Sequence, residues 1–380
     1  MSATGIAIFA LVALVFLGIS WASWKSYCLF HRGGRRVFAT IAIVSNLFWL
    51  ILPFIASERL SAAFRVARSV LGPPWFYWVV FSLVHVSLVV LVAIFWFFIA
   101  RRREPLSSFG RIYSELFFVA FAIVTAVGVV QALVPLRVER VPITIENLPA
   151  ELRGMRIALI SDIHVGLFSR PDRLAAISRA VMSQKPDHVV IAGDFIDDDP
   201  YFVPKFLKGL EPIGSGTPVT AVLGNHEIYG EPRDVIRQLR GTRVRLLVNE
   251  GTGILRGDEV LWLAGISDYA ARDELAPDLD AALRGRPANA PVIVISHQPR
   301  VFPEAIERGL PLVLAGHSHG GQFGIRWLGW SLAGVFIPYD MGLFQKGPTQ
   351  LYVTTGAGYW LVPMRFGMSP EVVVIELRGK

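Results

Sequence analysis

Cysteine is almost absent from this chain of 380 residues, and charged side chains are scarce. Cys28 stands alone, so no disulfide can form within the chain, and its hydrophobic neighbours argue against a nucleophilic role. Charged residues make up 18% of the sequence, whereas soluble globular proteins usually carry about 25%. Hydrophobic residues make up 53%. This balance predicts that part of the chain lies in a lipid bilayer.

Acidic residues are especially rare in the first third of the chain. Residues 1–136 carry a net charge of +8, and the remaining residues carry −1. Basic residues that flank membrane segments determine membrane topology, and this role accounts for the positive excess. We therefore expect the bilayer as a partner and no nucleic acid, because no separate basic patch is needed to explain the charge.

Four long runs without charge come first in the sequence. They span residues 2–24, 37–57, 69–100 and 116–136. About 20 apolar residues cross the hydrocarbon core as a helix. We therefore expect a multi-pass transmembrane domain of about four helices in residues 1–136. The first run could instead be a cleaved signal peptide, but it has no basic start, which favours a retained helix.

The distribution of Lys and Arg among the short loops predicts the orientation. The loops after the first and third runs hold eight Lys and Arg, whereas the opposite side holds five. Positive charge collects on the cytoplasmic side. The N-terminus and residues 137–380 are therefore expected on the extracytoplasmic side.

A different pattern follows the hydrophobic runs. Residues 137–154 contain Pro142 and Pro149 and suggest a linker, and residues 155–380 suggest a second domain. In that domain short apolar runs alternate with helical stretches such as 172–184, which predicts an α/β fold with a buried sheet. The expected strands are 156–161, 188–192, 218–223, 260–265, 292–296, 312–315, 351–355 and 371–377.

Five of these strands end in polar residues that can bind metals. The strands are followed by Asp162 and His164, by Asp194 and Asp197, by Asn225 and His226, by His297, and by His317 and His319. Ligand sites of open α/β sheets gather at the carboxyl ends of strands. We therefore expect these side chains to converge in one crevice.

The residue types suit divalent metals of intermediate softness. Imidazole nitrogens bind Zn and Fe, and carboxylates also bind Mn. Any single block is compatible with ordinary turn residues, since Asp, Asn and Gly are common after strands. All five together would bury several His and Asp side chains without partners, which is costly. A metal centre is therefore the favoured interpretation.

The five blocks occur in a recognisable order. They read D-x-H at 162–164, G-D-x-x-D at 193–197, G-N-H-E at 224–227, a single His297, and G-H-x-H at 316–319. This order resembles the calcineurin-like metallophosphoesterase superfamily, from about Met155 to the C-terminus. The resemblance implies that the transmembrane helices are followed by a four-layer α/β/β/α sandwich.

The resemblance also implies a role for each residue. Asp162, His164 and His319 would hold one divalent metal ion, Asn225, His297 and His317 would hold a second, and Asp194 would bridge the two. His226 would act as general acid and Asp197 would orient it. The two ions would be Mn, Zn or Fe, and a metal-activated hydroxide would attack phosphorus.

The substrate class follows from the extended last block, Gly316 to Gln322, and the membrane segments. Together they resemble membrane-associated phosphodiesterases and UDP-2,3-diacylglucosamine pyrophosphatase-type enzymes. This implies hydrolysis of phosphodiester or pyrophosphate bonds in lipid-linked or cell-envelope substrates. A phosphomonoesterase and a non-catalytic receptor or transporter subunit are the alternatives. Asp198 stands where phosphoprotein phosphatases have Arg, which argues against a phosphoprotein substrate.

Residues 323–344 form an aromatic-rich segment with only two charges, Arg326 and Asp340. Four glycines and Pro338 argue against a further membrane helix. The segment could be a lipid-facing lip, because Trp and Tyr favour the membrane interface. It could equally form buried strands of the core.

Overall fold

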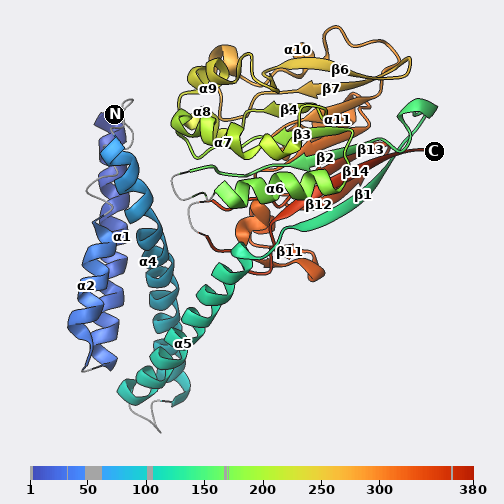
Figure 1. The fold of residues 1–380 in the computed structure, drawn as a ribbon. Helices are drawn as coiled ribbons and strands as arrows, with labels where there is room; N and C mark the ends of the chain where they lie inside the picture. Colours follow the sequence, from blue (N-terminus) through green and yellow to red (C-terminus); the bar gives the residue numbers. More distant parts are fainter. Residues whose placement is uncertain are drawn as a thin grey trace. The chain divides into compact units, whose positions relative to one another are not determined.

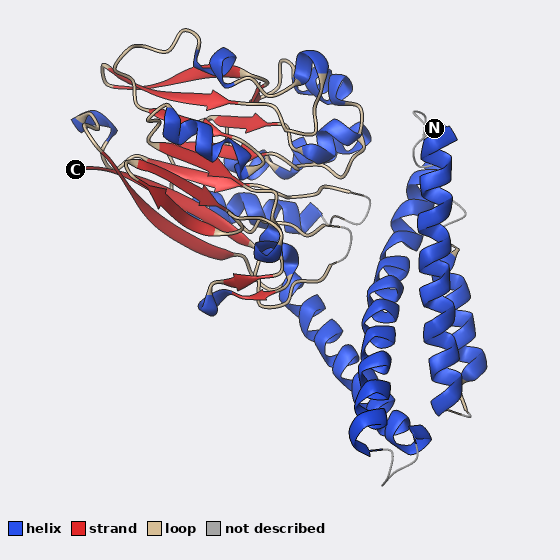
Figure 2. Cartoon of the chain, turned by 180° about the vertical axis from the view of Figure 1, so that it is seen from behind, coloured by secondary structure: helices blue, strands red, loops and turns tan. Residues whose placement is uncertain are grey.

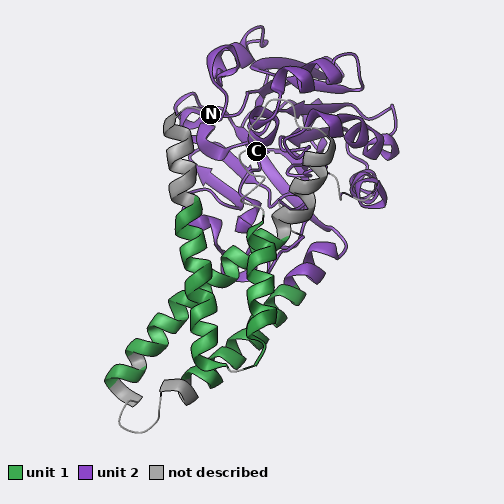
Figure 3. Ribbon diagram, turned by 90° about the vertical axis from the view of Figure 1, so that its left-hand side faces the viewer, with its two compact units in different colours: residues 1–127 green, residues 128–380 purple. Residues whose placement is uncertain are grey.

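A computed structural model describes residues 3–31, 33–47, 62–100, 106–166, 169, 171–360 and 363–380. The chain divides into two compact units, residues 1–127 and residues 128–380 (Figure 3). The first is helical, and the second contains both sheets and helices.

The first unit consists of long apolar helices. They are α1 (Ala3–Phe30), α2 (Arg35–Asn46), α4 (Ala62–Phe95) with a π-helical extension (Trp96–Ala100), and α5 (Leu106–Leu133), which enters the second unit at Gly128. Three segments among the described residues, Ala13–Phe30, Tyr77–Phe98 and Gly110–Leu133, are long and apolar enough to cross a membrane. The chain is therefore membrane-associated. The second expected run, 37–57, begins in α2 and continues into residues outside the described part.

Two six-stranded sheets form the centre of the second unit (Figures 1 and 2). The first sheet has the order β1 (Arg137–Ile145), β14 (Glu371–Gly379), β2 (Arg156–Ile160), β3 (His188–Ala192), β4 (Val219–Val222) and β5 (Val244–Leu247). The second has the order β12 (Gly342–Lys346), β13 (Thr349–Val353), β9 (Leu312–Ala315), β8 (Val292–Ile295), β7 (Glu259–Gly265) and β6 (Glu250–Arg256). A short hairpin joins β10 (Gly324–Ile325) to β11 (Trp330–Ser331).

The two sheets face each other across a shared apolar core. Ile157 and Val190 from the first sheet belong to the same buried cluster as Ile293 and Leu312 from the second. The outer face of the first sheet is covered by α6 (Pro171–Ser183), α7 (Val203–Gly209) and α9 (Pro232–Leu239), and that of the second by α10 (Leu279–Leu283) and α11 (Phe302–Glu307). The expected α/β/β/α layering is confirmed. The central strands read as continuous apolar runs because both of their faces are buried.

Strand register places the carboxyl ends of the central strands at one edge. β2, β3 and β4 are parallel, with Ile160 beside Ile191 and Ala192 beside Val222. In the second sheet β8 and β9 are also parallel, with Ile295 beside Leu314. The polar blocks that follow these strands therefore leave each sheet at the same edge.

The segment 137–154 is more structured than its prolines suggested. Its first half is β1, which pairs with β14 in parallel from Arg137 to Ile145. β1 lies at the edge of its sheet, where a residue without an N–H such as Pro142 is tolerated. The sheet thus begins at Arg137, and the domain limits at 136 and 155 stay predictions.

Candidate metal centre

The strand ends that carry the polar blocks have an unusual backbone. Five of the seven expected metal ligands have φ between 49° and 75°: Asp162, His164, Asp194, His317 and His319. Residues other than Gly rarely adopt this left-handed backbone conformation. Such strained residues concentrate at functional sites, where the surrounding structure holds them in place.

Close backbone approach explains two glycines of the motifs. A Cβ atom at Gly224 would collide with the carboxylate of Asp194, and one at Gly316 would collide with that of Asp162. Glycine at these positions therefore lets the strand ends come together around the carboxylates.

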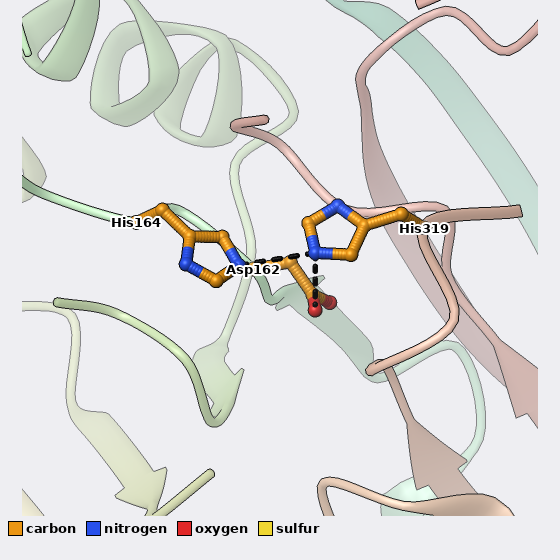
Figure 4. A group of neighbouring side chains, drawn as sticks. All are labelled: Asp162, His164 and His319. Carbon is orange, nitrogen blue, oxygen red and sulfur yellow. Dashed lines mark hydrogen bonds and ion pairs between the residues drawn. The ribbon is translucent and has the colours of Figure 1, made fainter. Parts of the chain in front are cut away.

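A first group of donor atoms consists of Asp162, His164 and His319 (Figure 4). The Nε2 atoms of the two histidines lie 3.0 Å apart, and Nε2 of His319 lies 3.2 Å from Oδ1 of Asp162. All three side chains are buried. They come from the end of β2 and from the turn that follows β9, which are far apart in the sequence.

A second group consists of Asn225, His297 and His317. Oδ1 of Asn225 lies 2.8 Å from Nδ1 of His317 and 3.1 Å from Nε2 of His297. The two imidazole nitrogens lie 3.3 Å apart. Nδ1 of His297 donates to the carbonyl of Ala192 at 2.7 Å, so Nε2 is the nitrogen that faces the group.

Asp194 lies between the two groups. Its Oδ2 is 3.1 Å from Nε2 of His297 and 3.7 Å from Nε2 of His164. Its Oδ1 accepts the backbone N–H of His226 at 2.9 Å. The structure therefore brings all seven expected ligands together, with Asp194 in the position expected of a bridge.

Burial keeps three of the imidazoles neutral. It lowers the pKa of His164 to about 3 and that of His317 to about 4, and the pKa of His319 falls well below its ordinary value. Burial also opposes the charged form of His297, but the neighbouring Asp194 raises the pKa of His297 above its ordinary value. Neutral imidazoles have the free lone pair that a metal ligand needs.

The donor spacing fits divalent cations. Ligand atoms about 2.0–2.2 Å from a tetrahedral ion lie about 3.3–3.6 Å from one another, and neighbouring ligands of an octahedral ion lie about 3 Å apart. The separations within the two groups range from 2.8 to 3.3 Å. Carboxylate, amide and imidazole groups gathered this closely in a buried place are costly unless a cation lies between them. The residues present therefore fit two metal ions.

His226 lies at the side of the first group. Its ring centroid is 4.7 Å from that of His164, with the ring planes nearly perpendicular. Its Nδ1 bonds to the carboxylate of Asp198, whereas Asp197, which was expected to orient it, lies 3.8 Å away. Burial works against protonation of His226, but the Asp198 hydrogen bond and the charge of Asp194 raise its pKa to about 9.

Sequence reasoning missed two residues that the structure places around the centre. Arg365 is fully buried and its Nη2 lies 3.4 Å from Nδ1 of His319. Trp360 has its ring 6.1 Å from that of His226. Neither lies in a motif block, and a lone Arg in the apolar stretch before Phe366 was the only available signal.

Glu227 holds the backbone of the loops around the centre in place. Its side chain is fully buried, and it accepts the backbone N–H groups of Asp194, Ile196 and Gly224 at 2.7–3.0 Å. These bonds join the loop after β3 to the loop after β4, so Glu227 positions Asp194 and Asn225 relative to each other.

The family model for calcineurin-like phosphoesterases matches residues 155–321. An uncharacterized metallophosphoesterase of Helicobacter pylori is 33% identical over 287 residues, which cover 74% of each chain. The chain belongs to the calcineurin-like phosphoesterase family. As a metallophosphoesterase it is a hydrolase of phosphate esters.

Two further relatives of this metallophosphoesterase differ in length and name. A transmembrane protein with metallophosphoesterase domain from Danio rerio is 31% identical over 331 residues, covering 80% of this chain and 74% of the relative. The phosphodiesterase YaeI of Escherichia coli is 30% identical over 230 residues, covering 58% of this chain and 82% of the relative.

Proposed function

We propose that this metallophosphoesterase hydrolyses phosphodiester or pyrophosphate bonds with a dinuclear metal centre. This proposal rests on the position of Asp194 between the two three-residue donor groups. Its Oδ2 lies 3.1 Å from Nε2 of His297 in one group and 3.7 Å from Nε2 of His164 in the other. In this proposal Asp162, His164 and His319 hold one ion, and Asn225, His297 and His317 hold the other. The pair of cations, Mn, Zn or Fe, would acidify water and neutralise phosphoryl charge.

The protein's own groups complete the reaction. His226 donates a proton to the leaving oxygen, and the Asp198 carboxylate on its Nδ1 fixes the ring so that the opposite nitrogen carries that proton. Asp197 lies close enough to add negative charge beside the same ring. Glu227 keeps the two loops of the centre in register through its three backbone hydrogen bonds.

A diester or pyrophosphate in a lipid-linked or cell-envelope substrate is the preferred substrate class. The phosphodiesterase name of the Escherichia coli relative supports a diester. The apolar helices support a substrate that is itself near a membrane, because they hold the catalytic unit there.

In the same proposal the chain crosses the membrane several times and carries its catalytic unit on the extracytoplasmic side. The excess of Lys and Arg in the first and third loops supports this orientation. A fusion after Lys380 to alkaline phosphatase should be active, and one to green fluorescent protein should be dark. The reverse result would place the catalytic unit in the cytoplasm.

The test of the reaction uses the full chain in detergent, stripped of metal and reloaded with Mn, Zn or Fe. We expect faster hydrolysis of bis(p-nitrophenyl) phosphate than of p-nitrophenyl phosphate, and the opposite preference would indicate a phosphomonoesterase. His226→Ala should lose turnover. His188→Ala is the matched control, because this buried imidazole lies outside the centre and bonds to Thr220. No hydrolysis of either ester with any metal would contradict the proposal.

A further inference from the structure

Exposed hydrophobic side chains of the second unit concentrate in one short segment. Among the described residues of 128–380, fourteen large hydrophobic side chains are exposed, and seven of them lie within residues 325–336. If exposed hydrophobic side chains were spread evenly over the unit, about one would lie in this segment. Exposed apolar patches of this kind mark sites that bind a partner or a membrane. We name six of them the β10–β11 surface: Trp327, Leu328, Trp330, Leu332, Val335 and Phe336. Trp327 is 84% exposed and Phe336 is 80% exposed.

The base of this surface is firmly held. Nη2 of Arg326 lies 2.9 Å from the buried carboxylate of Glu371, and the hydroxyl of Ser331 donates to Asp340 at 2.6 Å. The hairpin pairing of β10 with β11 adds further backbone bonds. Arg326 is the only charged residue of the segment 325–336, and its guanidinium is paired. The surface is therefore a fixed apolar projection without free charge.

The loop next to this surface is bound to the end of a candidate membrane span. The carbonyl of Gly128 accepts the N–H of Arg365 at 2.9 Å, and Oε1 of Gln131 accepts the N–H of Gly367 at 2.6 Å. Gly128 and Gln131 belong to the last two turns of the span Gly110–Leu133. At 1.5 Å per residue, Gly128 lies about 8 Å from the end of that span along the helix.

The same loop is bound to the start of the β10–β11 segment. The rings of Phe323 and Phe366 stack with centroids 4.9 Å apart, and Gly324 donates its N–H to the carbonyl of Phe366 at 2.9 Å. Figures 1 and 2 both show β11 beside the end of α5 that lies in the second unit. The end of the span, the loop 363–367 and the β10–β11 segment thus form one continuous structure within this unit.

We propose that the β10–β11 surface inserts into the interfacial layer of the same membrane that α5 crosses. The contacts with Gly128 and Gln131 place the loop at the depth where the span leaves the bilayer. Trp side chains favour this layer because their rings are amphipathic. An apolar face without free charge enters the boundary between headgroups and acyl chains to a depth of about 5–10 Å.

The insertion would bring the metal centre to the headgroups, a consequence that rests on the proposed function. His319 and the turn to Gln322 directly precede the segment. Gln322 exchanges two hydrogen bonds with the backbone of Trp360, whose ring lies beside His226. A phosphodiester of a lipid headgroup would therefore reach the centre without leaving the interface.

Nitroxide labelling of the full chain in phosphatidylcholine and phosphatidylglycerol vesicles tests the insertion. Cys28→Ser removes the native thiol, and Trp327→Cys or Phe336→Cys then supplies a single label site. Leu255→Cys is the matched control, because Leu255 is 74% exposed near the end of β6, away from the β10–β11 segment. We expect power saturation to show several-fold greater accessibility to oxygen than to a water-soluble nickel complex at 327 and 336, and the reverse at 255.

Two outcomes would overturn the insertion. Labels at 327 and 336 that respond to nickel as the control does would place the surface in water. Dipolar broadening that disappears when labelled chains are diluted with unlabelled ones would show that a second copy covers it. Thermal unfolding monitored by circular dichroism checks that each labelled variant folds. As a measurement without labels, brominated lipids should quench the unmodified chain more than Trp327→Phe, and equal quenching also contradicts insertion.

Discussion

The two halves of the metal centre present the same number of donors but are held in different ways. In the half formed by Asn225, His297 and His317, Nδ1 of His297 donates to the carbonyl of Ala192. In the other half, Nδ1 of His164 is buried and has no hydrogen-bond partner in the described structure. Nδ1 of His319 faces Arg365, which can only donate a proton.

The difference concerns which nitrogen of each imidazole carries the proton. A carbonyl on Nδ1 stabilises the tautomer whose Nε2 lone pair is free for a metal. His297 has such a carbonyl, whereas His164 and His319 do not. Their orientation depends instead on the left-handed backbone at Asp162, His164 and His319. We infer that the His297 half is prepared for its ion and that the His164 half binds its ion more weakly.

Removing the residue shared by both halves should have the largest effect. Asp194→Ala deletes the carboxylate between His164 and His297, and we expect it to lose both metal ions and all measurable turnover. Metal content by mass spectrometry checks this against Asp199→Ala, which removes a nearby carboxylate outside both groups. Retention of one full equivalent of metal by Asp194→Ala would show that the two halves do not depend on a shared ligand.

Removing one ligand from each half in turn should show which half binds its ion more tightly. We expect His164→Ala to keep one ion that resists a chelator, and His297→Ala to keep one ion that a chelator removes readily. Loss of an orienting partner usually changes metal affinity by about 10- to 100-fold, and we expect a difference of this size. Timed dialysis against EDTA measures it. Equal rates of release from the two variants would remove the distinction between the halves.

Replacing His226, the proposed general acid beside the metal centre, should lower turnover without changing the metal content of either half. His226→Ala is expected to keep both ions and to lower turnover by about 10²- to 10⁴-fold, the usual contribution of a general acid. Metal analysis and hydrolysis of bis(p-nitrophenyl) phosphate on the same preparation check both parts. A variant that loses metal would make His226 a ligand of the His164 half, beside which its ring lies.

The smallest expected effect is the difference in turnover between variants of two adjacent carboxylates, Asp198 and Asp197. Asp198→Asn should lower turnover by about 10-fold or more, because Asp198 bonds to Nδ1 of His226 and second partners of this kind contribute about that much. Asp197→Asn should have a weaker effect, because its carboxylate lies 3.8 Å away. Steady-state kinetics should show the change in kcat rather than KM. A larger loss in Asp197→Asn would restore the original assignment of Asp197.

The contrast between Asp197 and Asp198 shows where sequence reasoning stops. The block G-D-x-x-D indicated a carboxylate near His226, but spacing alone cannot say which of the consecutive residues Asp197, Asp198 and Asp199 turns toward the ring. Asp198 has a left-handed backbone, with φ of 53°, which redirects its side chain. A local backbone reversal of this kind depends on the surrounding loops and leaves no sign in composition.

The strands show the opposite case. β2, β3, β8 and β9 were predictable within one residue, because each is a short apolar run that ends at a polar block. β1 was missed because Pro142 suggested a linker, although an edge strand tolerates proline. For residues 323–344 the sequence left two possibilities open, and only the exposure of Trp327 and Phe336 distinguished a projecting surface from buried strands.

By itself the sequence determined the order of apolar runs and the chemistry of the residues that follow them, because burial requires hydrophobic side chains and metal ions require His, Asp and Asn. The tertiary structure alone decided which carboxylate reaches His226 and how Arg365 comes to lie beside His319. These contacts join segments that are distant in the chain, so the register of the two sheets brings them together and local pattern cannot.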